Sequence, residues 1–251
     1  MEETILTAKD LKFRYDPEQP DYALNGVSAE VKRGEFVAVL GANGCGKSTL
    51  AKHFNAILLP ESGTVLVEGM DTKDEDKIYD IRQTVGMVFQ SPDNQIVATV
   101  VEEDVAFALE NLGVPPEEMR RRVDEAMKMA GIYEYRERAP HNLSGGQKQR
   151  VAIVRALCMH PEILLFDEVT AALDPEMVRE VLDVMLDLAK QGKTMIIVTH
   201  EMQFARAIAN RVIFLDGGKI VEEAAPAEFF ERPKTERAQR FLRTFTFDAV
   251  K

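Results

Sequence analysis

The fold of this chain is decided by the stretch Gly41-Ala42-Asn43-Gly44-Cys45-Gly46-Lys47-Ser48-Thr49. It follows the apolar segment 36–40, which is typical of a strand, and precedes a stretch that is typical of a helix. Spacing and context together match the phosphate-binding pattern Gly-x4-Gly-Lys-Ser/Thr. The glycines allow backbone N–H groups to turn inward around an anion at a helix N-terminus. We expect Lys47 to reach the β- and γ-phosphates of a nucleotide and the Ser48 hydroxyl to bind Mg²⁺.

Cys45 lies inside this loop and has two interpretations. It is either a small, tolerated side chain or a thiol that acts as a redox brake. We favour the first, because such a loop uses its backbone rather than that side chain. Cys45 and Cys158 are too few for a disulfide framework, and neither has a metal-ligand spacing such as CxxC. Both are therefore predicted to be reduced thiols.

Composition limits what the rest of the chain can do. With 251 residues, of which 45% are hydrophobic and 29% charged, it has the balance of a globular protein. Its apolar runs stay short of the ~20 residues that a membrane-spanning helix needs. Its first residues lack the basic start and apolar stretch of a secretory signal, so we expect a cytoplasmic protein. The net charge of −11 argues against nucleic acid as a partner, and the run Arg120-Arg121-Arg122 sits among glutamates, as on a solvated helix face.

The order of the predicted elements indicates an α/β fold. The first third reads as short extended pieces separated by glycines, and the pattern becomes helical over about 100–137. There a Val114-Pro115-Pro116 break predicts the start of a new helix. The second half alternates helices with apolar strands, at 163–166, 195–198 and 212–215. A core-facing stripe marks one of these helices, at Val178, Val181, Leu182 and Met185. Strand, helix, strand order predicts a parallel sheet with right-handed crossovers.

The stretch Leu143-Ser144-Gly145-Gly146-Gln147 narrows the family, since a phosphate-binding loop alone is shared by kinases, GTPases and motors. It matches the ABC signature motif without a departure, so the chain resembles the ATPases of ABC transporters. Ser144 and the two glycines begin a predicted helix whose N-terminus offers a second anion site. The resemblance implies a head-to-tail dimer, in which the signature of one chain closes on ATP held by the other. That second ATPase chain is identical or related.

Three more residues match landmarks of the family, which follow in order along nearly the whole chain. Tyr15 matches the aromatic residue that stacks on adenine, and Gln90 matches the Q-loop glutamine, a catalytic residue and Mg²⁺ ligand. His200 matches the switch histidine at the γ-phosphate. An aromatic residue near a strand end, or a glutamine in a loop, also serves packing alone, and this alternative stays open for Tyr15 and Gln90.

The stretch Ile163-Leu164-Leu165-Phe166-Asp167-Glu168 resembles a Walker B strand. The resemblance implies that Asp167 holds Mg²⁺ through water and that Glu168 orients and polarises the attacking water. Val169 and Ala171 depart from the family, which usually has proline and serine there. Losing the proline frees the backbone, so we expect Glu168 to be held less rigidly. Turnover, not nucleotide binding, would be affected.

The resemblance also implies the architecture and the partners. It predicts one ABC ATPase domain over 1–251 with a P-loop NTPase fold: an N-terminal antiparallel β subdomain, a mainly parallel core sheet over 1–90 and 160–251, and an inserted helical subdomain over 91–159. A transmembrane transporter subunit is the expected partner, so the chain would lie peripherally on the inner face of the cell membrane. The cargo is selected by that partner or by a binding protein, and vitamin, metal ion and amino acid remain open.

Different segments of the chain resemble two subfamilies of importer ATPase. The segments 90–97 and 101–107 look like energy-coupling-factor ATPases for cobalt, nickel or vitamins, whereas 199–205 and 229–234 look like polar amino-acid importer ATPases. A natural intermediate, a natural recombination and an engineered chimera joined near Leu143 to Arg155 all fit. We favour the chimera, because the resemblance switches at one place. A chimera would leave a non-native interface with small cavities or strain.

The function favoured is that of the ATP-hydrolysing subunit of a bacterial importer, with ATP and Mg²⁺ as ligands. One alternative is a soluble ABC ATPase that acts without a membrane partner, and the energy-coupling-like segment counts against it. The other is a module that dimerises with ATP but hydrolyses it weakly. Intact Glu168 and His200 oppose this second alternative, whereas Val169 and a chimeric origin favour it.

Overall fold

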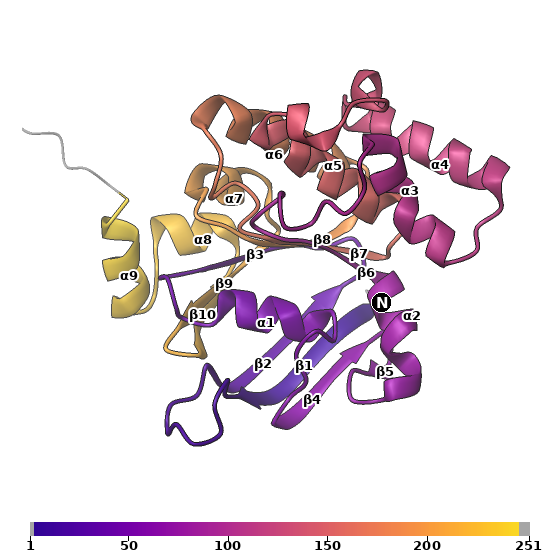
Figure 1. Cartoon of the computed structure of the whole chain (residues 1–251). Coiled ribbons are helices and arrows are strands. Elements are labelled where there is room, and N and C mark those ends of the chain that lie inside the picture. Colours follow the sequence, from indigo (N-terminus) through magenta and orange to yellow (C-terminus); the bar gives the residue numbers. More distant parts are fainter. Residues whose placement is uncertain (1–2, 246–251) are drawn as a thin grey trace, which may run out of the picture. The chain divides into compact units, whose positions relative to one another are not determined.

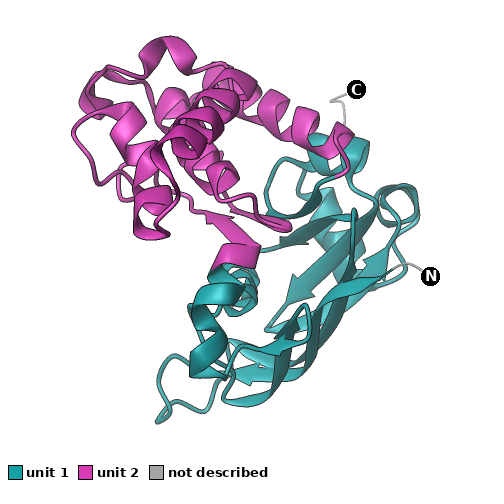
Figure 2. Ribbon diagram, turned by 90° about the vertical axis from the view of Figure 1, so that its right-hand side faces the viewer, with its two compact units in different colours: residues 1–82, 193–251 teal, residues 83–192 magenta. Residues whose placement is uncertain are grey.

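The computed structural model describes residues 3–245, and the chain forms two compact units (Figure 2). Unit 1 comprises residues 1–82 and 193–251, and unit 2 comprises residues 83–192. Residues 1–2 and 246–251 of the predicted domain lie outside the described part. The helical subdomain predicted over 91–159 falls inside unit 2, and its bounds remain a prediction.

Unit 1 begins with an antiparallel sheet in the order β2-β1-β4-β5 (Figure 1). Its strands are β1 (Thr4–Phe13), β2 (Leu24–Lys32), β4 (Ser62–Val67) and β5 (Met70–Asp71). Buried and exposed residues alternate along β2, as expected for a sheet with one face in the core. The predicted antiparallel β subdomain is confirmed.

The other strands of unit 1 carry the phosphate-binding loop. They are β3 (Phe36–Gly41), β8 (Thr194–Val198), β9 (Arg211–Asp216) and β10 (Lys219–Ala224). Within this unit they run in the order β10-β9-β3-β8, with β3 parallel to both β8 and β9 and with β10 antiparallel to β9. Every residue of β3 is buried, which explains its unbroken apolar sequence. The predicted parallel core is confirmed.

Helices complete unit 1. They are α1 (Lys47–Phe54), α7 (Met202–Ile208), α8 (Pro226–Glu231) and α9 (Glu236–Arg243), with a short 3₁₀ turn η1 (Glu75–Lys77). Helix α2 (Ile78–Thr84) leads from unit 1 into unit 2. Helix α1 packs against β3, β4 and β8, so the helix that follows the loop rests on both sheets of the unit.

Unit 2 joins one parallel strand pair to a set of helices. Its strands are β6 (Val85–Val88) and β7 (Ile163–Asp167). Its helices are α3 (Val101–Asn111), α4 (Pro116–Met129), α5 (Gly145–Cys158) and α6 (Pro175–Lys190), with 3₁₀ turns η2 (Tyr133–Tyr135) and η3 (Pro140–Asn142). Helix α5 packs against α3, α4 and α6 and is therefore the central element of the helices. The predicted break is confirmed, because α4 begins at Pro116.

The predicted core stripe of α6 is confirmed for three of its four residues. Val181, Leu182 and Met185 are buried, whereas Val178 is only half-buried. Val178 lies in the first turn of the helix, ahead of the part that enters the core. Among residues 3–245 no helix combines the length and the apolar character needed to cross a membrane.

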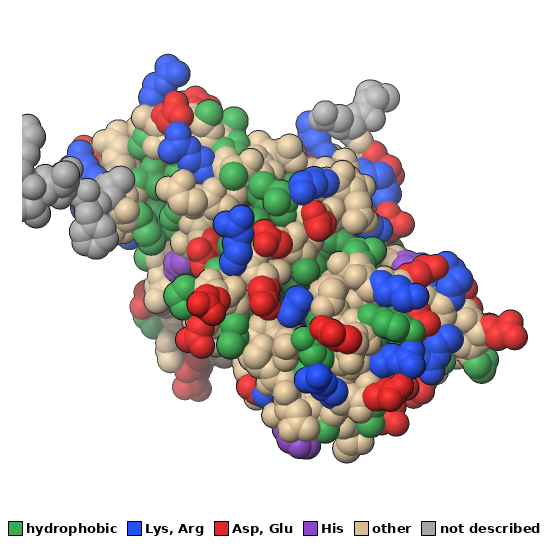
Figure 3. Space-filling view, turned by 90° about the horizontal axis from the view of Figure 1, so that it is seen from above, with side chains coloured by type: hydrophobic (Ala, Val, Ile, Leu, Met, Phe, Trp, Pro, Cys, Tyr) green, Lys and Arg blue, Asp and Glu red, His purple; other side chains and the backbone are tan. Residues whose placement is uncertain are grey.

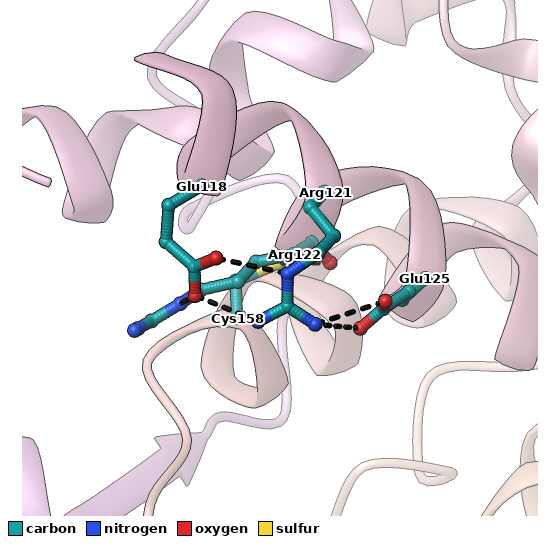
Figure 4. A network of polar contacts seen from close by, with 5 residues as sticks. All are labelled: Glu118, Arg121, Arg122, Glu125 and Cys158. Carbon is teal, nitrogen blue, oxygen red and sulfur yellow. Dashed lines mark hydrogen bonds and ion pairs between the residues drawn. The ribbon is translucent and has the colours of Figure 1, made fainter. Parts of the chain in front are cut away.

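The arginine run lies on the exposed face of α4, as predicted. Arg121 binds Glu118 at 2.8 Å and Glu125 at 3.0 Å, and Arg122 binds Glu118 at 2.6 Å (Figure 4). These hydrogen bonds lower the pKa of Glu118 to about 2, and the bond from Arg121 has the largest effect. Beneath them the Cys158 sulfur donates to the Arg122 carbonyl at 3.7 Å. On the face seen in Figure 3, Lys and Arg side chains are interspersed with Asp and Glu in the same manner.

Candidate nucleotide site

The phosphate-binding loop depends on glycine for steric reasons. Gly46 has φ +106°, and a Cβ there would lie 2.6 Å from the Ala23 carbonyl oxygen. A Cβ on Gly41 would lie 2.3 Å from the Leu215 carbonyl oxygen and 2.6 Å from the Cys45 sulfur. The backbone therefore turns between two neighbouring chain segments that leave no room for a side chain.

Cys45 is buried under this loop, with its sulfur packed towards Gly41. Burial raises the pKa of the thiol, and the nearby Lys47 offsets only part of this effect. A buried thiol that stays protonated reacts slowly with oxidants and alkylating agents. These observations support the interpretation of Cys45 as a small packing residue rather than a redox brake.

Lys47 is almost fully buried, with 4% of its surface exposed. Its Nζ donates to the carbonyl oxygens of Gly41 and Ala42, both at 3.1 Å. The ammonium group is thus held inside the curve of the loop by backbone dipoles. Ser48, next in the chain, is half-buried at the start of α1. Lys47 and Ser48 therefore stand at the junction of loop and helix, and their contacts with phosphate and Mg²⁺ stay predictions.

Tyr15 is held beside α1 and yet is 63% exposed as a residue. Its hydroxyl lies 3.0 Å from Thr49 Oγ1, and the edge of the Phe13 ring contacts it with centroids 5.0 Å apart. The Thr49 carbonyl accepts a hydrogen bond from Nδ1 of buried His53 at 2.7 Å. Burial lowers the pKa of His53, so the imidazole is neutral and its Nδ1 proton serves this bond. No sequence motif indicated this role for His53.

Strand register brings His200 to the same sheet edge as the loop. Val39 of β3 pairs with Val198 of β8 in a parallel ladder. Gly41 and His200 each lie two residues beyond that pair, at the carboxyl ends of neighbouring strands. Ligands bind at this edge in open α/β sheets. Unit 1 therefore gathers the loop and His200 at one edge, and Tyr15 beside α1.

In unit 2 the predicted acids likewise lie at the carboxyl ends of two paired parallel strands. Val88 of β6 pairs with Phe166 of β7, so Gln90 and Glu168 each lie two residues beyond the pair. Asp167, the last residue of β7, is buried with 6% exposed, whereas Gln90 is exposed. The carboxyl edge of this strand pair therefore carries an amide and two carboxylates together.

Glu168 has a backbone conformation that is unusual for a residue other than glycine. Its φ is +49°, and its carbonyl accepts a hydrogen bond from Ala171 N at 3.0 Å. Such a conformation costs about 1–2 kcal/mol and persists where neighbouring contacts fix it. Val169 is 2% exposed, so its packing anchors the turn. Valine thus packs at the position where the family usually has proline, and the expected effect on turnover stays a prediction.

The signature stretch forms the start of α5 through a capping box. Gln147 N donates to Ser144 Oγ at 3.2 Å, and Ser144 N donates to Gln147 Oε1 at 2.9 Å. The glycines have a second role that the sequence did not reveal. A Cβ on Gly146 would lie 2.9 Å from Met177 Cβ, because α6 crosses here. The predicted anion site at this helix start stays a prediction.

The residues predicted to bind Mg²⁺ each carry a donor that suits this ion better than a softer metal. Ser48, Gln90 and Asp167 offer a hydroxyl, an amide and a carboxylate oxygen, all hard donors. Within residues 3–245 no three His, Cys, Asp or Glu side chains are gathered into a metal-binding cluster. Mg²⁺ commonly needs only one or two protein carboxylates, because substrate phosphates and water complete its coordination.

Comparison with known proteins identifies the family. A family model described as ABC transporter matches residues 24–171. The energy-coupling factor transporter ATP-binding protein EcfA1 of Clostridium novyi is 53% identical over 233 residues, which cover 92% of this chain and 83% of that protein. EcfA1 of Symbiobacterium thermophilum is 50% identical over 247 residues, with 96% and 86% covered.

Solved structures agree. The structure of cbiO1 from Clostridium perfringens, described as part of the ABC transporter complex cbiONQ, has a TM-score of 0.83 at 37% identity and covers 97% of this chain and 96% of that chain. A dimeric, ADP- and phosphate-bound structure of the ATP-binding cassette MJ0796 has a TM-score of 0.79 at 34% identity, with 88% and 99% covered.

The extent of these matches bears on the predicted join near Leu143 to Arg155. The EcfA1 matches run across more than nine-tenths of the chain and so include both sides of that position. The hypothesis of a chimera is therefore not supported. Together with the P-loop and the signature helix, the comparisons show that the chain belongs to the ABC transporter family, as one of its ATP-binding proteins.

Proposed function

We propose that this chain is the ATP-hydrolysing subunit of an energy-coupling-factor importer. The observation that carries the proposal is the position of Lys47. Two carbonyl oxygens hold its Nζ inside a loop whose close backbone packing requires glycine at positions 41 and 46. A buried ammonium group beside a helix N-terminus is suited to an anion with several negative charges. The family and the EcfA1 relatives support ATP as that anion.

In this proposal unit 1 binds the nucleotide. The loop 41–49 surrounds the phosphates, and Lys47 exchanges its carbonyl partners for β- and γ-phosphate oxygens. The exposed ring of Tyr15 stacks on adenine, since Thr49 and Phe13 already fix its orientation. His200 contacts the γ-phosphate from the neighbouring strand end. A pre-oriented ring loses little entropy when it binds.

The predicted metal ligands and Glu168 supply the groups for hydrolysis. Ser48, Asp167 and Gln90 would hold Mg²⁺, which neutralises phosphate charge when bound. Glu168 accepts a hydrogen bond from the attacking water and orients it. The turn at Glu168, closed by the hydrogen bond from Ala171 N, suits this role, because catalysis of phosphoryl transfer depends mainly on positioning.

A second ATPase chain completes each site in this proposal. The start of α5, with Ser144, Gly145, Gly146 and Gln147, closes on the γ-phosphate held by the partner. The dimeric structures of the cassette MJ0796 support this, since the similarity covers 88% of this chain and 99% of that protein's chain. The partner is a second copy or a related ATPase.

The membrane partner docks on unit 2 in this proposal, which places the chain at the inner face of the membrane. Two large apolar side chains of this unit are exposed to solvent: Val97 is 62% exposed, and Phe107 on α3 is 47% exposed. A hollow of about 320 Å³ lies between α3 and α4, with Glu102 and Glu103 on its rim. cbiO1 is described as part of a transporter complex, which supports such docking.

The proposal is tested with Glu168→Gln, which keeps the shape but replaces the charged carboxylate by a neutral amide that polarises water only weakly. With ATP and Mg²⁺ this variant should elute as a stable dimer in size-exclusion chromatography, whereas Lys47→Ala should stay monomeric under the same conditions. Co-expression with candidate membrane subunits tests the importer part. A chain that hydrolyses ATP but never co-purifies with a membrane subunit would instead be a soluble ABC ATPase.

A further inference from the structure

The segment 89–98, which links β6 to α3 and contains Gln90, has no regular secondary structure, yet buried side chains fix it. Gln95 is 7% exposed. Its Oε1 accepts from Phe89 N at 3.1 Å, and its Nε2 donates to the carbonyls of Phe89 and Ser91, both at 3.0 Å. The Gln95 amide thus closes the segment into a ring around Gln90.

A residue of the signature helix binds the same carbonyl. Gln149 of α5 is fully buried, and its Nε2 donates to the Phe89 carbonyl at 2.9 Å. Its Oε1 is buried and accepts no hydrogen bond from the described residues. An unsatisfied buried acceptor destabilises a fold by about 1–3 kcal/mol, so an apolar residue of the same size would pack here with a lower free energy. What the glutamine supplies is the hydrogen bond to the residue before Gln90.

A second connection joins the far end of the segment to α5. Asp104 of α3 is fully buried, and its Oδ1 accepts from Val97 N at 2.6 Å and Ala98 N at 3.1 Å. Its Oδ2 lies 3.4 Å from Nη1 of Arg155 on α5. The same nitrogen donates to the Gln95 carbonyl. Burial lowers the pKa of Arg155 and Asp104 opposes this effect, so the pair is held in a desolvated setting.

A third connection lies at the surface, where Lys148 of α5 binds Asp93 at 2.6 Å. Helix α5 therefore reaches the segment at three points along its length. Those contacts meet the Phe89 carbonyl directly before Gln90, the Asp93 carboxylate and the Gln95 carbonyl. Exposed Val97 is connected to α5 through Asp104. The helix itself begins with the signature stretch.

We propose that Gln149 and Arg155 are positioning residues that make the segment 89–98 and the signature helix one rigid piece. A shift of Gln90 caused by nucleotide, or of Val97 caused by a docked partner, is then transmitted to Ser144–Gln147 through these side-chain bonds to the segment's backbone. This inference rests on the proposed function, since it assigns Gln90 and Val97 to those ligands. It goes further by naming the residues that connect them to the signature.

The test uses Gln149→Leu in the full-length protein, because leucine keeps the volume and removes the one donor. Cys158→Ala is the matched control: it also removes buried atoms from α5, but its sulfur contacts the Arg122 carbonyl of α4. Steady-state ATPase assays give kcat and KM separately. Hydrogen exchange measured by mass spectrometry reports on residues 89–98.

Gln149→Leu should lower kcat by about ten- to hundredfold with KM for ATP within about twofold, since misplacement by an ångström has effects of that size. Exchange over 89–98 should rise about tenfold or more. Cys158→Ala should lower the melting temperature without either change. Asp104→Asn, which weakens the second connection, should act in the same direction as Gln149→Leu and serves if that variant does not fold.

Two results would overturn the inference: a kcat in Gln149→Leu that falls no further than in Cys158→Ala, or unchanged exchange over 89–98. A wild-type protein without ATPase activity would instead contradict the proposed function. The exchange comparison would then still decide whether α5 holds the segment, so the two failures are distinguishable.

Discussion

Gly46→Ala tests the steric account of the phosphate-binding loop. Alanine at φ +106° is strained by about 1–2 kcal/mol. Its Cβ would also lie 2.6 Å from the Ala23 carbonyl oxygen and 2.9 Å from Leu24 Cδ2. Both atoms belong to a packed segment, and forcing extra volume into such a place costs about another 1–3 kcal/mol. We expect Gly46→Ala to lose about 2–5 kcal/mol of unfolding free energy.

Gly44→Ala is the matched control, because Gly44 also has a positive φ, of +76°, but a Cβ there meets no atom of the described residues within 4 Å. It should lose only the strain of about 1–2 kcal/mol. Urea unfolding of both variants without nucleotide, compared at equal slope, measures the difference. Equal losses in the two variants would refute the argument that Ala23 and Leu24 confine the loop.

Three further predictions concern single side chains. Lys47→Ala should weaken ATP binding by at least about tenfold in isothermal titration calorimetry, since hydrogen bonds to a charged group contribute about 1.5–3 kcal/mol; an unchanged affinity would count against the loop assignment. Ser144→Ala should cost about 0.5–2 kcal/mol of stability through loss of the helix cap, and Ser144→Asp should restore most of it; no difference between the two would exclude the capping role. Burial raises the pKa of Cys158 to about 12, so the folded thiol keeps its proton where the unfolded thiol loses it. The stabilisation that comes from this difference is complete below the ordinary thiol pKa near 9 and is lost as pH rises towards about 12. Cys158→Ser should therefore lose less unfolding free energy at alkaline pH than the wild type, and parallel profiles of unfolding free energy against pH would contradict this.

Much of the fold was predictable because its signals are local. The run of apolar residues in β3 reflects burial of the whole strand, and the spacing of Ser144 and Gln147 is that of a capping box. The phosphate-binding loop combines a strand, glycines and a helix start within a few residues. In each case the interacting groups are close in sequence, so the pattern carries the structure.

Contacts between distant residues left no such pattern. Gln149 and Phe89 lie 60 positions apart, and a glutamine within a helix normally indicates a solvated face. Arg155 and Asp104 likewise lie 51 positions apart, and both are charged. In the sequence, Gly146 indicated an anion site. Its close approach to Met177 could not be predicted, because it depends on where α6 crosses α5. Hydrophobic periodicity does not record such polar and steric pairings.

If a second chain completes the site at which this chain hydrolyses ATP, hydrolysis must depend on the protein concentration. The most direct test is the ATPase rate of the purified protein with Mg²⁺ across a range of protein concentrations, with Glu168→Gln measured beside it. We expect a rate per chain that rises with protein concentration before it saturates, and loss of activity in the variant. A rate per chain independent of concentration, or full activity in Glu168→Gln, would contradict this.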